Sequence, residues 1–161
     1  MEQPIESFDE VLEEAGINKN DCYRIYPSWN HHILKTTPNG RQRPYSDAIL
    51  LLMHFFYMHI PIEVYDPATG TLLGYQARFH GDKCLQSHKE IKDFFRLSEH
   101  KLKKAMHYLA SRGFIVVEPH SPGFSFVTVV PKKISEITYD LGIRREDYLY
   151  DVDSPAATEE E

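Results

Sequence analysis

Apolar residues recur at intervals of three or four positions in two neighbouring stretches of the chain, and this spacing predicts two α-helices. In the first stretch the apolar stripe consists of Ile91, Phe94 and Phe95. Ser87 and Glu90 have the spacing of a capping box, in which the serine oxygen accepts a bond from a free backbone N–H of the first turn. Residues 86–90 are therefore predicted to open the first helix, and residues 96–98 to form the turn after it.

The second helix is predicted over residues 99–112, with Ser98 as its N-cap and Gly113 as the left-handed residue that ends it. At about 100° per residue, one face carries four apolar side chains suited to a core, namely Leu102, Ala105, Met106 and Leu109. The opposite face and its flanks are polar or basic and carry His100, Lys101, Lys103, Lys104, His107 and Ser111. Arg112 closes the helix on the same basic side.

Beyond Gly113 the pattern changes to short apolar runs separated by turn residues, which is typical of β-strands. Residues 114–117 and 124–130 are the predicted strands, and residues 120–123 (His-Ser-Pro-Gly) are the predicted turn. The stretch 87–130 thus predicts a helix, a turn, a second helix and a two-stranded hairpin.

Ser46 caps a further predicted helix, which must end before Pro61. Residues 48–58 are almost all apolar, so this helix must be covered on more than one side. The hairpin-bearing core can cover one face only, and the N-terminal segment, the C-terminal segment or a second subunit can cover the other. Because the N-terminal segment offers few apolar groups, we expect a homodimer through the Ser46–His59 helix.

Weaker signals predict three further elements. A capping box at residues 7–10 opens a short helix that ends near residue 15. Residues 62–65 and 71–79 predict a hairpin, and the wide spacing of Pro67 and Gly70 requires a longer loop with a bulge. Residues 134–141 predict a short helix near the end of the chain.

The net charge of −6 is distributed unevenly along the chain. Residues 1–22 hold seven acidic residues and one basic residue, and residues 134–161 hold nine and two. Residues 23–133 therefore hold fifteen basic and eight acidic residues. A basic middle between acidic ends is typical of a nucleic-acid footprint with solvating or competing arms. The alternative is that the lysines only form a solvated helix face.

Residues 28–44 show no clear period and contain the strong turn signal Pro38-Asn39-Gly40. Lys35, Arg41 and Arg43 lie in the same stretch, with no acidic residue among them. Two interpretations stay open for this segment, a basic loop beside DNA and a plain surface loop.

The chain lacks the motifs of phosphate-binding loops and of hydrolase nucleophiles. His80, Cys84 and His88 are ligand types that suit zinc, and Asp82 lies between them. They run from a predicted strand end into a helix start, so their side chains need not converge. We expect no enzymatic activity, no cofactor and no metal.

The sequence shows no clear signal for secretion or for a membrane span. Cys22 and Cys84 are far apart in sequence and suggest no disulfide framework, which favours a reducing compartment. The first ten residues lack the apolar run of a signal peptide. The longest apolar stretch, residues 48–58, is too short to span a bilayer. We expect a cytoplasmic protein that does not enter a membrane.

The segment LSEHKLKKAMHYLASRGFIVVEP resembles the recognition-helix-to-wing segment of winged-helix DNA-binding proteins. In that pattern a leucine near the helix end precedes a basic step, a glycine and an apolar pair, which are here Leu109, Arg112, Gly113, Phe114 and Ile115. The layout of an apolar helix, an inserted hairpin and then a helix-turn-helix is similar to the N-terminal domains of phage and plasmid replication initiators (replisome organisers).

The resemblance covers about residues 45–133 and implies an α+β fold, a winged helix-turn-helix with N- and C-terminal extensions and a β-hairpin insertion. We therefore divide the chain into an N-terminal extension and loop (1–44), a winged-helix DNA-binding domain (45–133) and an acidic C-terminal extension (134–161).

The resemblance also implies that the helix at 99–112 contacts double-stranded DNA. Lysines can neutralise phosphates, and the two histidines can donate to phosphate or to guanine acceptors. The predicted DNA contacts are Ser98, His100, Lys101, Lys103, Lys104, His107, Ser111, Arg112, Lys132 and Lys133. We expect a replication-initiator-like protein or a transcriptional regulator. The alternative is a winged helix that binds proteins and whose acidic arms meet a basic partner.

Overall fold

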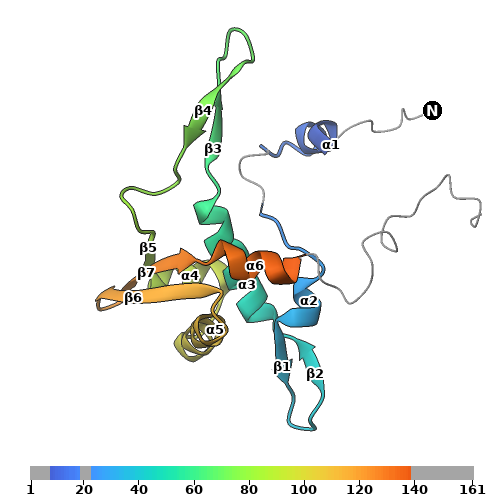
Figure 1. Ribbon diagram of the computed structural model, residues 1–161, viewed down its shortest axis with the longest axis vertical. Helices are drawn as coiled ribbons and strands as arrows, with labels where there is room; N and C mark the ends of the chain where they lie inside the picture. The colour runs from blue at the N-terminus through green and yellow to red at the C-terminus, as the bar shows by residue number, and fades with distance from the viewer. Residues whose placement is uncertain (1–7, 19–22, 139–161) are drawn as a thin grey trace, which may run out of the picture.

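The computed structural model describes residues 8–18 and 23–138, and it is an α+β fold built around helix α3 (Ser46–His59) (Figure 1). The predicted N-terminal helix is present as α1 (Phe8–Glu14). The first residues of the chain, Cys22 and the residues after 138, which include most of the expected acidic C-terminal extension, lie outside the described residues.

The two predicted helices and the turn between them are confirmed. Helix α4 (His88–Phe95) is capped by Ser87, whose side chain accepts a hydrogen bond from the Glu90 N–H at 3.3 Å. Helix α5 (Glu99–Ser111) is capped by Ser98, and Gly113 follows it with φ of +80°. That left-handed conformation is the one glycine adopts most readily, so the sequence ends α5 where expected.

The chain also forms a three-stranded antiparallel sheet, with strand order β5-β7-β6. Strands β6 (Ile115–Ser121) and β7 (Phe124–Val129) form the predicted hairpin, although β6 continues through two of the four residues predicted as its turn. A register shift between Pro119 and Ser121 lets proline sit in this edge strand. The third strand, β5 (Leu85–Ser87), was not predicted because three residues are too few to show an alternating pattern.

Two further hairpins extend from opposite ends of the body (Figure 1). Strands β3 (Ile62–Tyr65) and β4 (Leu72–Gln76) form the predicted one, and the expected bulge occurs at the Val64/Tyr65 step. The other consists of β1 (Leu34–Thr36) and β2 (Gln42–Pro44), and it follows the short helix α2 (Trp29–His32). Both elements lie in the stretch that showed no clear period.

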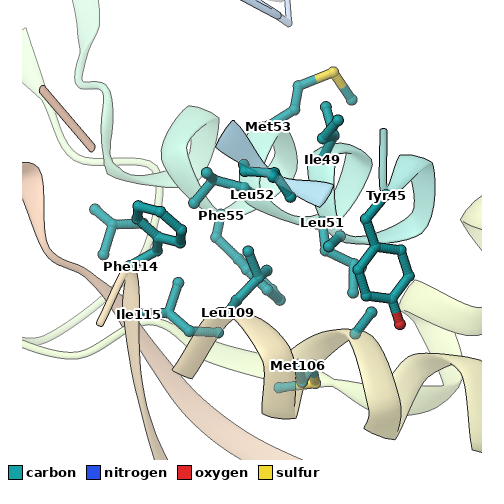
Figure 2. Packing of buried hydrophobic residues seen from close by; sticks show 14 of the residues in the cluster. Tyr45, Ile49, Leu51, Leu52, Met53, Phe55, Met106, Leu109, Phe114 and Ile115 are labelled. Carbon is teal, nitrogen blue, oxygen red and sulfur yellow. The ribbon is translucent and has the colours of Figure 1, made fainter. Parts of the chain in front are cut away.

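One hydrophobic core joins α3, α5, the sheet and both flanking segments. Figure 2 shows its centre, where α3 side chains face Leu109 of α5 and Ile115 at the start of β6. Trp29 and Ile33 from the N-terminal side are fully buried in this core. Helix α6 (Pro131–Thr138) adds Ile134 and Ile137 from the other end, and it begins three residues earlier than predicted.

The flanking segments remove our reason for expecting a homodimer through α3. Every apolar side chain of this fully described helix is buried or half-buried. Its second face is covered within the chain, where the rings of Tyr26 and Trp29 lie 6.4 and 6.3 Å from that of Phe56, and Tyr23 lies 4.4 Å from Tyr57. We underestimated this cover because α2 has only four residues and no amphipathic period.

Candidate nucleic-acid interface

Helix α5 separates its apolar and basic side chains as predicted. Leu102, Ala105, Met106 and Leu109 are buried, whereas the polar and basic side chains of the other face are exposed. Ser98 is occupied as the N-cap, since its hydroxyl accepts a hydrogen bond from the Lys101 N–H at 3.2 Å. Within the described part of the chain the outward face of α5 is therefore exposed, while Ser98 has a structural role.

A groove of about 560 Å³ lies between this outward face and strand β1. It brings together six of the predicted contacts, His100, Lys101, Lys104, His107, Ser111 and Arg112. The remaining walls come from Leu34, Lys35, Thr36, Tyr45, Asp47 and Tyr108. Most of the predicted α5 residues thus share one concave surface with a segment of the chain more than fifty residues away.

Tyr108 fixes the position of β1 against α5. The backbone N–H of Leu34 donates to the Tyr108 hydroxyl oxygen at 3.0 Å. The Tyr45 ring packs edge-on against the Tyr108 ring with 5.0 Å between centroids. The groove therefore has a rigid aromatic floor, because a directed hydrogen bond and a ring contact both hold it.

Positive charge dominates the groove. Lys35, Lys101, Lys104 and Arg112 line it, together with one acidic residue, Asp47. Among the described residues, none of these four cations forms an ion pair. The Arg112 guanidinium lies 5.1 Å from the centre of the Tyr108 ring, which orients it without neutralising it.

Lys103 differs from its neighbours because it pairs with Glu99 one turn earlier, at 3.3 Å. The hydrogen bond and the charge of Lys103 lower the pKa of the Glu99 carboxyl. Both side chains are largely exposed, so the pair is weak and a phosphate can compete for the lysine. Lys103 lies outside the main groove and lines a shallower hollow on the other side of α5.

That second hollow, of about 270 Å³, lies between α5 and the β6–β7 hairpin. His88 lines it and bonds to the Ser125 hydroxyl at 2.8 Å. Burial lowers the pKa of His88, and the nearby charges of Lys92 and Lys103 lower it further. Helix α5 is thus flanked by one hairpin on each side, β1–β2 along the main groove and β6–β7 along this hollow.

Lys132 and Lys133 lie beyond the C-terminal end of α5, at the start of α6. The Lys133 side chain passes close to Gly113 and pairs with Glu136 at 3.6 Å. Neither lysine lines the main groove. They can reach a ligand that extends past the end of α5 but are separate from its central surface.

Sequence reasoning left the role of Lys35 open and missed the two tyrosines of the groove. The signal available for Lys35 was the run of three bases without an acid, together with the Asn39-Gly40 hairpin turn. The tyrosines gave no signal, because their role depends on contacts between segments far apart in the chain.

His80, Cys84 and His88, whose side-chain types suit zinc, each have a different environment. Cys84 is buried and its sulfur accepts a hydrogen bond from the Gln86 amide, His88 bonds to Ser125, and His80 is exposed. Within residues 8–18 and 23–138, no three His, Cys, Asp or Glu side chains gather in a metal-binding arrangement. Over the same ranges, no helix is long and apolar enough to cross a bilayer.

Comparisons with known protein families, with curated proteins and with solved structures give no match. The function must therefore be inferred from the groove itself and from the topology that positions it.

Proposed function

We propose that this protein binds double-stranded DNA as a winged helix, with α5 as the recognition helix and β6–β7 as the wing. The element order α3, β5, α4, α5, β6, β7 and the strand order β5-β7-β6 support this proposal. Apart from β5, this order is the one that the sequence resemblance implied, with the β3–β4 hairpin as the insertion after α3. The biological role is that of an origin binder or a transcriptional regulator.

The observation that carries the proposal is the basic groove along α5. Thirteen residues give α5 a length of roughly 20 Å at about 1.5 Å per residue, and the B-DNA major groove is about 12 Å wide and admits an α-helix. Lys101, Lys104 and Arg112 project from its exposed side without ion pairs among the described residues. Cations placed in this way can neutralise phosphates on both sides of a groove.

The composition of α5 favours modest sequence specificity. Arginine, asparagine and glutamine are the commonest bidentate readers of bases, and none occurs within α5. His100 and His107 project into the groove and can donate to guanine acceptors or to phosphates. Groove shape therefore contributes a large share of any selectivity.

A salt titration tests the proposal. Each phosphate contact contributes about −0.9 to the slope of log affinity against log salt, so four groove cations predict a slope of about −3.6 or steeper. Lys104→Ala should flatten the slope by about one, measured by fluorescence anisotropy on a labelled duplex.

Lys89→Ala is the control, because Lys89 is also an exposed lysine, lies on α4, pairs with Asp93 and lies outside the groove. Equal effects of the two substitutions would contradict a contact at α5. No duplex binding at low salt would overturn the proposal and favour the protein-binding alternative.

A further inference from the structure

The β1–β2 hairpin carries a concentration of positive charge that the groove alone does not explain. Residues 34–44 contain Lys35, Arg41 and Arg43 and no acidic residue. All three side chains belong to exposed residues. Among the described residues, none of the three takes part in an ion pair.

Two of these charges are placed directly opposite each other. Lys35 and Arg43 are cross-strand partners in the hairpin, so their side chains leave the same face of the two strands. Like charges in this position destabilise a strand pair. A polyanion lying against this face would remove the repulsion, since each phosphate offers a compensating charge.

The hairpin is firmly built and tied to the recognition helix. Its turn is closed by the Thr37 N–H donating to the Arg41 carbonyl at 2.7 Å and the Gly40 N–H donating to the Thr37 carbonyl at 2.9 Å. At its base, the Tyr45 N–H donates to the carbonyl of the buried Ile33 at 2.8 Å. Together with the Leu34–Tyr108 bond, these contacts hold the basic side chains at a fixed place beside α5.

The other hairpin beside α5 is poorly suited to the same role. Residues 118–123 of the β6–β7 hairpin contain no lysine or arginine. The hairpin's Glu118 pairs with Lys83 and so neutralises that lysine. The positive arm next to α5 is therefore β1–β2, on the side away from the wing.

We infer that the β1–β2 hairpin is a second DNA-contacting arm, in which Arg41 and Arg43 bind phosphates flanking the groove that holds α5. This inference rests on the proposed function. The hairpin extends four or five residues beyond its base, or on the order of 13 Å at about 3.3 Å per residue. That reach is comparable to the width of the major groove, about 12 Å, so the tip can meet the bordering backbone.

The test compares Arg41→Ala/Arg43→Ala with the wild type and with Arg24→Ala, an exposed arginine outside the groove. We expect the double variant to flatten the log–log salt slope by about two and to shorten a hydroxyl-radical footprint at one end only. Arg24→Ala should leave both unchanged. Because both substituted side chains are exposed, we expect the urea midpoint of the double variant to equal that of the wild type. An unchanged midpoint shows that the weaker binding is not caused by a folding defect.

The outcomes separate this inference from the proposed function. If the double variant keeps the full slope and footprint while Lys104→Ala weakens binding, the hairpin is not a contact and α5 still is. If the wild-type chain binds no duplex at low salt, the proposed function fails and the hairpin role fails with it. Loss of footprint at both ends would also overturn the inference, since one arm protects one side.

Discussion

Substitution of Trp29 tests most directly whether the N-terminal segment is part of the hydrophobic core. It is the single tryptophan of the chain and is fully buried. Its ring packs near those of Tyr26 and Phe56, and its indole N–H donates to the Thr138 hydroxyl at 3.3 Å. It therefore joins α2 to α3 and to α6 at the other end of the described chain.

Trp29→Ala should lower the free energy of unfolding by about 3 to 5 kcal/mol, the range for deleting a large buried aromatic side chain. Trp29→Phe keeps most of the ring volume but loses the hydrogen bond, and we expect a loss of about 1 to 2 kcal/mol. Because whole domains are stable by about 5 to 15 kcal/mol, the alanine variant should be close to unfolding.

Urea unfolding followed by circular dichroism at the helix band measures these losses in all variants. Tyr75→Ala is the control, because this β4 side chain is 65% exposed and its loss should change stability by less than about 0.5 kcal/mol. If Trp29→Ala costs no more than Tyr75→Ala, residues 23–44 are an appendage and the shared core is wrongly described.

Three further predictions concern helix α5 and the core. Ser98→Asp should keep the N-cap and therefore the urea midpoint, but it should weaken duplex binding in the anisotropy assay because it adds a negative charge beside α5. Ser98→Ala should instead lower the free energy of unfolding by about 1 kcal/mol, because it removes the N-cap. Gly113→Ala should cost about 1 kcal/mol in urea unfolding, because its φ of +80° strains any side chain although neighbouring atoms leave room for a Cβ. Burial lowers the pKa of His54 below its ordinary value of 6.5, so the unfolded state takes up the proton first as pH falls. The urea midpoint should therefore decrease below about pH 6.5, and the decrease should be smaller in His54→Gln; equal pH profiles for the two proteins would contradict this.

The helices near the middle of the chain were predictable because local chemistry determines them. Ser87, Ser98 and Gly113 are capping and stop signals that act within a few residues, and the apolar period of α5 is strong. The residues on the outward face of α5 followed from the same period. Prediction of this part required no knowledge of distant contacts.

The rest depended on contacts between distant segments. Strand β1 has only three residues and is positioned by the Tyr108 hydroxyl, 74 residues away in sequence, so no local pattern reveals it. Trp29 belongs to a four-residue helix whose burial comes from α3 and α6. The same long-range packing explains why a second subunit seemed necessary to cover α3 when the chain covers it by itself.

The measurement that tests the central claim most directly is a two-dimensional ¹H–¹⁵N spectrum of the full chain titrated with a short DNA duplex at low salt. The largest amide shifts should occur in α5, from His100 to Ser111, and in the residues of β1 that line the groove. Shifts centred instead on the exposed Phe94 side of α4, or a spectrum unchanged by duplex, would contradict DNA binding through the α5 groove.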